Sequence, residues 1–202
     1  MKLKWLFPVA LVGALVAQPV LAEAVSDQAK PEADAKSPAA QRAKIRELAN
    51  DTLAQIYKAH PEAEATIAKS AGYAVFDTGG AMILFAGAGG GSGVAVSLPS
   101  KHETFMGVAQ AKAGLGLGIK NSRLVLVFTS PKAFNKFVTS GWAFSGDATA
   151  AAKANDKGLG LTGASMIAKD VFAYQFTENG LTAEATVAGS KYYVDKKLNA
   201  GK

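Results

Sequence analysis

The 202-residue chain contains no cysteine, and it has only two histidines and two tryptophans. The absence of cysteine excludes disulfides, thiolate nucleophiles, cysteine-ligated zinc, iron–sulfur clusters and lipoprotein-type acylation. With so few ligand-forming side chains, we expect neither a metal nor another cofactor. Glycine, in contrast, is abundant: 21 residues, where an average composition of roughly 7% would supply fewer.

Long apolar runs are confined to the N-terminus. A positively charged start and an apolar run from Trp5 to Val16 are followed by Val20-Leu21-Ala22, which suits a signal peptidase. The run is shorter than the about 20 apolar residues that a membrane span needs. We therefore expect residues 1–22 to be a signal peptide cleaved after Ala22. The mature chain would then be periplasmic or secreted, either soluble or peripherally bound to a membrane.

The rest of the chain divides into a tail and a domain. Residues 23–36 are rich in Ala, Lys, Glu and Asp and show no apolar period, which predicts a flexible linker. Residues 37–202 are apolar enough to build a core, and their number suits one domain.

Three helices are predicted from local start and stop signals. Ser37-Pro38 begins a helix whose apolar stripe runs to about His60, where the following Pro61 disfavours helical geometry. A short second helix extends from Pro61 to about Ser70. Ser130-Pro131 begins a third helix, which ends at Gly141.

The remaining apolar segments are predicted to be strands. Gly79-Gly80 is predicted to be a turn, and Asn179-Gly180 indicates a hairpin. Residues 192–198 close the domain as a short helix or strand. The predicted strands are residues 73–76, 82–85, 105–111, 115–119, 124–128, 142–144, 171–176 and 181–187. The order of elements predicts an α+β domain in which N-terminal helices pack on a curved, glycine-rich, barrel-like antiparallel sheet.

Gly114, Gly116 and Gly118 occupy alternate positions of one predicted strand. Because side chains alternate across a sheet, these glycines would line one face. Such a row indicates close approach of a helix, another strand or a ligand, or tight curvature of the sheet.

Acidic residues are scarce in the middle of the chain. Residues 78–146 contain six basic residues and a single acid, Glu103, which gives this segment a net charge of +5. A positive zone of this kind attracts anionic surfaces over about 10 Å at moderate salt. A solvated rim on an ordinary domain would have the same composition.

Segments that resemble catalytic or cofactor-binding motifs lack the neighbouring residues that those motifs require. Residues 158–163 match the dinucleotide fingerprint letter for letter, but no apolar strand precedes them and too little chain follows for a crossover helix. Ser92 lacks the glycine that a nucleophile elbow requires after it. His60 and His102 stand apart in sequence, and Glu103 has no acidic neighbour. We therefore expect no catalytic residues and no enzyme. Nucleic-acid binding is also disfavoured, because the basic residues are dispersed and no aromatic residues interleave them.

Several segments in order resemble the SYLF lipid-binding domain family. The resemblance extends from about Pro61 to Asn199 and lies in Ala68-Lys69-Ser70-Ala71-Gly72-Tyr73-Ala74-Val75-Phe76, Gly79-Gly80, residues 87–94, residues 114–118, residues 121–128, Trp142-Ala143-Phe144-Ser145-Gly146-Asp147, Tyr174, Gly180-Leu181 and Lys191-Tyr192-Tyr193. Residues 97–103 depart from the Gly-Trp-Ser-x-Pro-like turn of eukaryotic members. The departure puts the eukaryotic ligand preference in doubt.

The resemblance implies a module that binds anionic phospholipid or a membrane surface, in a bacterial exported branch of the family. Actin binding belongs to one fungal branch, and export makes actin an implausible partner. The residues that we expect to attract lipid are the cations of the positive zone: Lys101, Lys112, Lys120, Arg123, Lys132 and Lys136. The alternative is a structural or interaction protein of the envelope that recruits a protein partner through an exposed sheet edge.

Overall fold

The computed structural model describes residues 37–83, 86–113, 118–144, 161–177, 180–182 and 189–201, so the expected signal peptide and linker lie outside the described residues. Residues 37–202 form one compact unit. The described helices are α2 (Pro38–Ala59), α3 (Pro61–Ala68), α4 (Pro131–Ser140) and α6 (Lys196–Asn199). The described strands are β1 (Gly72–Ile83), β2 (Ala86–Ser97), β3 (Glu103–Ala113), β4 (Gly118–Phe128), β5 (Trp142–Phe144), β6 (Ser165–Ala168), β7 (Val171–Thr177), β8 (Gly180–Thr182) and β9 (Ser190–Val194).

Local capping signals explain where the two longer helices begin and end. The Ala40 N–H donates to the Ser37 hydroxyl (3.2 Å), and Pro38 occupies the first turn of α2. In α4, the Ala133 N–H donates to the Ser130 hydroxyl (3.3 Å), and Gly141 ends the helix at φ 66°. The predicted boundaries of both helices are confirmed.

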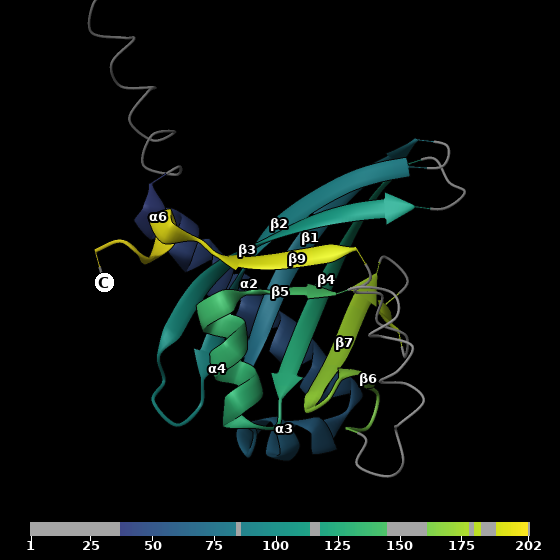
Figure 1. Cartoon of the computed structure of the whole chain (residues 1–202). Helices are drawn as coiled ribbons and strands as arrows, with labels where there is room; N and C mark the ends of the chain where they lie inside the picture. Colours follow the sequence, from purple (N-terminus) through teal and green to yellow (C-terminus); the bar gives the residue numbers. More distant parts are fainter. Residues whose placement is uncertain are drawn as a thin grey trace, which may run out of the picture. The chain divides into compact units, whose positions relative to one another are not determined.

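The strands form a single antiparallel sheet within the described residues. Its order is β5-β9-β3-β2-β1-β4-β7-β6, and β8 also pairs with β7 (Figure 1). β1 lies in the middle and pairs along almost its whole length with both β2 and β4.

The sheet is strongly curled. Phe76 of β1 and Tyr192 of β9 belong to strands that are separated by β2 and β3, which would put them about 14 Å apart in a flat sheet. Their ring centroids are nevertheless 4.8 Å apart. The sheet therefore folds β9 back over β1 and forms a half-barrel with a concave inner face.

Glycines of β2 permit this curvature. Gly89, Gly91 and Gly93 alternate along the strand, and a Cβ atom added at Gly91 would lie 1.9 Å from the Asp77 carbonyl oxygen of β1. At Gly93 the corresponding distance to the Val75 carbonyl oxygen is 2.2 Å. No side chain fits between β1 and β2 at these positions. Glycine is therefore needed here because it lets the two strands approach closely. The row predicted at 114–118 lies largely outside the described residues.

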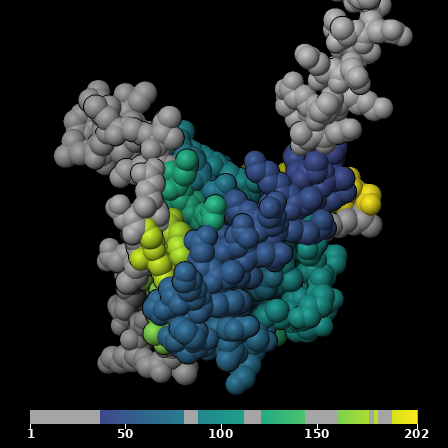
Figure 2. Space-filling model, turned by 180° about the vertical axis from the view of Figure 1, so that it is seen from behind, coloured from purple at the N-terminus to yellow at the C-terminus, as the bar shows by residue number. Residues whose placement is uncertain are grey.

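Each face of the sheet carries its own apolar cluster. On the concave face, Phe134 and Phe137 of α4 pack among Phe76, Phe128 and Tyr192. On the convex face the buried apolar residues of α2, α3 and α6 pack on the opposite side chains of the same strands, and Figure 2 shows α2 and α3 lying across that side. None of the helices in the described ranges is both long and apolar enough to cross a membrane.

The α+β architecture with helices on a curved antiparallel sheet is confirmed, but several local predictions are wrong. Gly79-Gly80 is not a turn, because both residues lie inside β1 and pair with Gly90 and Gly89. β6 was not predicted. Residues 192–198 are neither one helix nor one strand, since β9 ends at Val194 and α6 begins at Lys196. Met82 and Ile83 do not start a new strand but end β1, and Gly118 and Ile119 belong to the same strand, β4, as residues 124–128. Residues 84–85, 115–117 and 183–187 of the predicted strands lie outside the described residues.

The chain after Gly163 does not form the helix that a dinucleotide-binding motif requires. The next described element is the strand β6, which agrees with the rejection of the motif at residues 158–163 on its context. The residues 158–160 that open this motif lie outside the described part of the chain.

Candidate functional site

The cations predicted to attract lipid do not form one patch. Lys132 and Lys136 lie on α4, whereas Arg123 lies on β4 and Lys101 in the turn between β2 and β3. The structure fixes only the backbone of the other two: Lys112 pairs with Gly87 and Lys120 with Gly80. The predicted set therefore divides among different elements, and only Lys132 and Lys136 are brought together around one described cavity.

Lys132 and Lys136 border a cavity of about 300 Å³, together with a third lysine, Lys169. Lys169 lies in the turn between β6 and β7 and was not predicted, because it falls outside the positive middle of the sequence. The other lining residues are Ser130, Ala133, Trp142, Ala168 and Asp170. We call the three lysines and Trp142 the α4 basic surface.

The charges of the α4 basic surface are not neutralised internally. All three lysines are exposed, and within the described residues no ion pair joins any of them to an acidic group. Of the described residues that line the cavity, only Asp170 is acidic. The local excess of positive charge is thus available to an anion in solvent or at a surface.

The helix that carries two of these lysines is anchored to the core. Phe137 is fully buried, and its ring lies 4.9 Å from that of Phe128 and 6.4 Å from that of Trp142. Phe134 and Phe137, three residues apart, share the buried face of α4, whereas Lys132 and Lys136, four residues apart, are exposed. The two lysines are therefore held outward on a rigid element.

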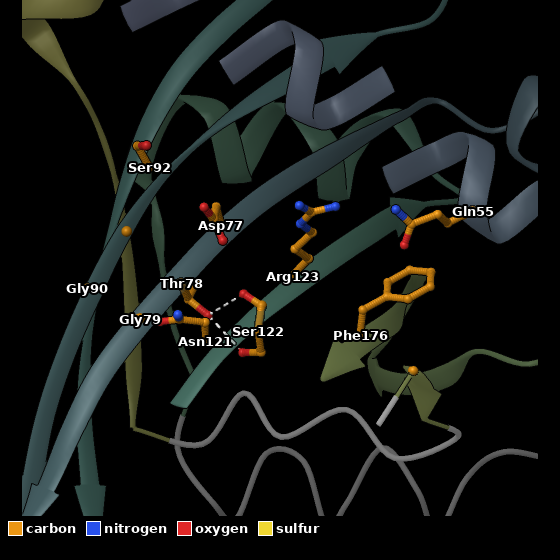
Figure 3. A pocket seen from close by; sticks show the side chains of 12 residues that line it. Gln55, Asp77, Thr78, Gly79, Gly90, Ser92, Asn121, Ser122, Arg123 and Phe176 are labelled. Carbon is orange, nitrogen blue, oxygen red and sulfur yellow. Dashed lines mark hydrogen bonds between the residues drawn. The ribbon is translucent and has the colours of Figure 1, made fainter. Parts of the chain in front are cut away.

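A second cavity, of about 710 Å³, is lined mainly by residues of β1, β2 and β4 and is bordered by α2. We call it the polar cavity. Its lining residues are Gln55, Asp77, Thr78, Gly79, Gly90, Gly91, Ser92, Asn121, Ser122, Arg123, Phe176 and Gly180. Figure 3 shows Asp77 and Arg123 projecting from neighbouring strands toward the same side, with Gln55 of α2 beyond Arg123.

Strand pairing fixes the backbone around the polar cavity. Asp77 and Arg123 are direct partners in the β1–β4 register. One residue further on, the Thr78 hydroxyl donates to the Ser122 carbonyl oxygen (2.9 Å). Thr78 is almost completely buried, so this contact satisfies a polar group inside the sheet.

Glu103, the single acid of the positive zone, pairs with the N-terminal part of α2. The Arg46 guanidinium donates to both carboxylate oxygens of Glu103 (2.8–3.0 Å) and lies 5.2 Å from the centre of the Phe105 ring. The hydrogen bond to Glu103 raises the pKa of Arg46. Glu103 therefore holds α2 to β3 and takes no part in either cavity.

The two histidines lie apart. His60 joins α2 to α3 and has its Nδ1 3.6 Å from a carboxylate oxygen of Glu62, while His102 is exposed beside the β2–β3 turn. Among the residues that the structure describes, no group of three or more His, Asp and Glu side chains could hold a metal ion.

Comparison with known proteins gives two matches. Residues 109–201 match the family Ysc84, described as "Las17-binding protein actin regulator". The chain is also similar to beta cell expansion factor A of Aeromonas veronii, with 32% identity over 160 residues, which are 78% of this chain and 58% of that protein. The match thus spans less than two thirds of the length of that curated relative.

Proposed function

We propose that this chain, which belongs to the SYLF (Ysc84) family, is an exported, non-catalytic protein that binds anionic phospholipid, as its resemblance to SYLF lipid-binding domains implies. The observation that carries this proposal is the convergence of Lys132, Lys136 and Lys169 around one cavity beside Trp142. The predicted signal peptide supports a periplasmic or secreted location.

The α4 basic surface has the physical properties that a peripheral membrane site needs. A lysine near an anionic surface contributes about 1 kcal/mol of attraction, so three can contribute about 3 kcal/mol. Long lysine side chains can also pack their apolar stems against lipid while the ammonium groups reach phosphates. The half-buried Trp142 adds an amphipathic ring of the kind that favours the membrane interface.

The matched family and the Aeromonas relative are named for other roles. Las17 binding and actin regulation are stated for the Ysc84 family, and beta cell expansion for the Aeromonas protein. Export would separate this chain from actin, so we propose a lipid surface and not actin as its partner.

A charge-matched comparison of variants tests the proposal. The test uses the chain from Glu23 onward, which contains the whole described structure and lacks the apolar N-terminus that would itself bind membranes. One variant combines Lys132→Gln, Lys136→Gln and Lys169→Gln. The control combines Lys58→Gln, Lys69→Gln and Lys197→Gln, three exposed lysines of α2, the α3 end and α6.

Both variants lose the same charge, so a difference between them reports position. In co-sedimentation with phosphatidylglycerol-containing vesicles at low salt, we expect the first variant to bind on the order of 100-fold more weakly and the control to bind nearly as the parent. Equal losses in the two variants would show that only the net charge matters. Unchanged binding of the first variant would remove the α4 basic surface from the account.

Salt dependence separates lipid binding from the alternative of an envelope interaction protein. Attraction by exposed lysines is screened within about 10 Å at 0.1 M salt, whereas addition of a strand to a sheet edge is not. Within the described residues the edge strands β5, β6 and β8 have only 3, 4 and 3 residues, and the β6 pairing contains a bulge. Short, irregular edges make poor templates for strand addition.

A further inference from the structure

The polar cavity contains a pair of opposite charges that the proposed membrane surface does not use. Asp77 and Arg123 are direct cross-strand partners, a placement in which opposite charges can interact favourably. Here no oxygen of Asp77 lies within 4.0 Å of a guanidinium nitrogen of Arg123, since the ion pairs found within the described residues are Arg46–Glu103 and His60–Glu62. Both charged groups therefore remain available to a ligand.

Other groups around this pair are also polar. Ser92 lies next to Asp77, and Asn121 and Gln55 are amides on either side of Arg123 (Figure 3). The walls between them are made partly of glycine backbone, which leaves room above the strands. Phe176, the partner of Arg123 on β7, supplies an apolar ring at one side.

These groups recognise a ligand that carries both signs of charge. A simple anion would engage the Arg123 guanidinium but would lie near the Asp77 carboxylate, and a simple cation would meet the opposite conflict. A zwitterion avoids both conflicts. Its anionic group accepts paired hydrogen bonds from the Arg123 guanidinium, and its ammonium group donates hydrogen bonds to the Asp77 carboxylate. Lys44 borders a neighbouring cavity with Asp77 but forms no ion pair with it among the described residues.

We propose that the polar cavity binds a phosphoethanolamine group, with the phosphate on Arg123 and the primary ammonium on Asp77. A free α-amino acid also has both charges, but on a single carbon, and it would fill only a small part of a cavity of about 710 Å³. A cavity of this size suits a larger ligand. Phosphoethanolamine continued by glycerol uses the remaining space beside Phe176 and the glycine walls.

This site is separate from the α4 basic surface. Residues two apart in a strand point to the same face of a sheet. Val75 and Val125 pack on the convex face with α2, so Asp77 and Arg123, each two residues away, also lie on that face. α4 packs on the concave face. Binding at the polar cavity can therefore fail while anionic-lipid binding at α4 holds, and the reverse.

The first test measures soluble probes by NMR titration of the chain from Glu23 onward. We expect O-phosphoethanolamine to bind with a dissociation constant on the order of 1 mM, as suits a small ligand in a partly open site. Phosphocholine should bind at least tenfold more weakly, because its quaternary ammonium has no N–H to donate to Asp77. Inorganic phosphate, which lacks the cation, should also bind at least tenfold more weakly.

Two variants separate the roles of the charges. Asp77→Asn should weaken O-phosphoethanolamine at least tenfold and leave or improve the binding of inorganic phosphate, whereas Arg123→Gln should weaken both. Lys69→Gln/Lys197→Gln is the matched control and should change neither, because these exposed lysines line neither the polar cavity nor the α4 basic surface. An unchanged melting temperature of each variant shows that its fold is intact. The proposal is overturned if O-phosphoethanolamine does not bind, or if Asp77→Asn leaves its affinity unchanged.

The same chemistry can come from a membrane or from solution, and a second arm distinguishes the sources. Neutral phosphatidylcholine vesicles with added phosphatidylethanolamine probe the lipid, and glycerophosphoethanolamine probes the soluble group. Binding to the vesicles that Asp77→Asn removes supports the lipid headgroup as the source. Binding to the soluble compound alone supports the free group, and binding to neither contradicts the proposal.

Discussion

The two halves of the central strands differ sharply although they belong to the same ladders. In one half, Val75 and Phe76 of β1 are fully buried between α2 on one side and α4 on the other, as are Val125 and Leu126 of β4. One residue beyond Phe76, Asp77 is exposed. Next along the strands come Thr78, Gly79 and Gly80 of β1 and, paired with the first two, Ser122 and Asn121 of β4. We call these the covered half and the open half.

The comparison shows how this fold separates stability from recognition. The covered half holds most of the large buried side chains and therefore most of the apolar burial that stabilises the domain. The open half contributes little to the core, but its strands continue without a break in register. Asp77 and Arg123 are thus positioned by the covered half, and neither forms an ion pair within the described residues.

The largest effect is expected in the covered half. Phe137→Ala removes a ring that contacts Phe76, Phe128, Trp142 and Tyr192, and should lower the free energy of unfolding by about 4 kcal/mol. Denaturant unfolding measures this loss. Lys136→Ala, the exposed neighbour on the same helix, is the control and should change stability by less than about 0.5 kcal/mol. A loss below about 1 kcal/mol for Phe137→Ala would contradict the division into halves.

A smaller effect is expected in the open half, where curvature depends on glycine. Gly91→Ala would place a methyl group 1.9 Å from the Asp77 carbonyl oxygen, so β1 and β2 must separate. Such overpacking should cost about 2–3 kcal/mol. At the adjacent Gly90 the nearest atom is 3.1 Å away, the Val108 carbonyl oxygen, and Gly90→Ala should cost clearly less. Equal melting temperatures of the two variants would show that Gly91 is not required for the close approach of β1 and β2.

The smallest of these effects depends on pH. Burial raises the pKa of Tyr174 to about 12, and its hydroxyl donates to the Thr162 carbonyl oxygen (3.1 Å). Tyr174→Phe should lose about 1 kcal/mol at neutral pH.

Because the folded pKa lies above the value of about 10 for unfolded tyrosine, the stability from the neutral phenol is fully present below pH 10. It is lost as the pH rises toward about 12, so the parent should lose stability faster than Tyr174→Phe in that window. The measurement is the free energy of unfolding of both proteins as a function of pH. If it falls equally in the two proteins across this pH range, the phenol of Tyr174 is not buried.

Local signals in the sequence were sufficient for the helices and for the α+β class. Ser37-Pro38, Ser130-Pro131 and Gly141 cap helices through contacts within a few residues, so their effect can be predicted without the fold. Gly79-Gly80 has the composition of a turn, but its conformation is set by pairing with Gly89 and Gly90 on one side and with Lys120 and Asn121 on the other. Tertiary pairing overrode the local preference.

The sites depend on contacts that a sequence does not display. Lys132 and Lys136 could be proposed from charge alone, but Lys169 joins them only because the turn between β6 and β7 lies beside α4. The opposition of Asp77 and Arg123 depends on the β1–β4 register. Residues that are distant in the chain become neighbours through topology, which periodicity and composition do not specify.

Trp142 provides the most direct measurement of the central claim, which is that the α4 basic surface binds anionic phospholipid. The chain has two tryptophans, and Trp5 is removed with the expected signal peptide, so the chain from Glu23 onward reports from Trp142 alone. Adding phosphatidylglycerol vesicles at low salt should shift its emission to shorter wavelength, and brominated phosphatidylglycerol should quench it. Both effects should disappear at high salt and in the Lys132→Gln/Lys136→Gln/Lys169→Gln variant. Emission that stays unchanged while the protein co-sediments with the vesicles would contradict the account, because the membrane would then lie against another surface.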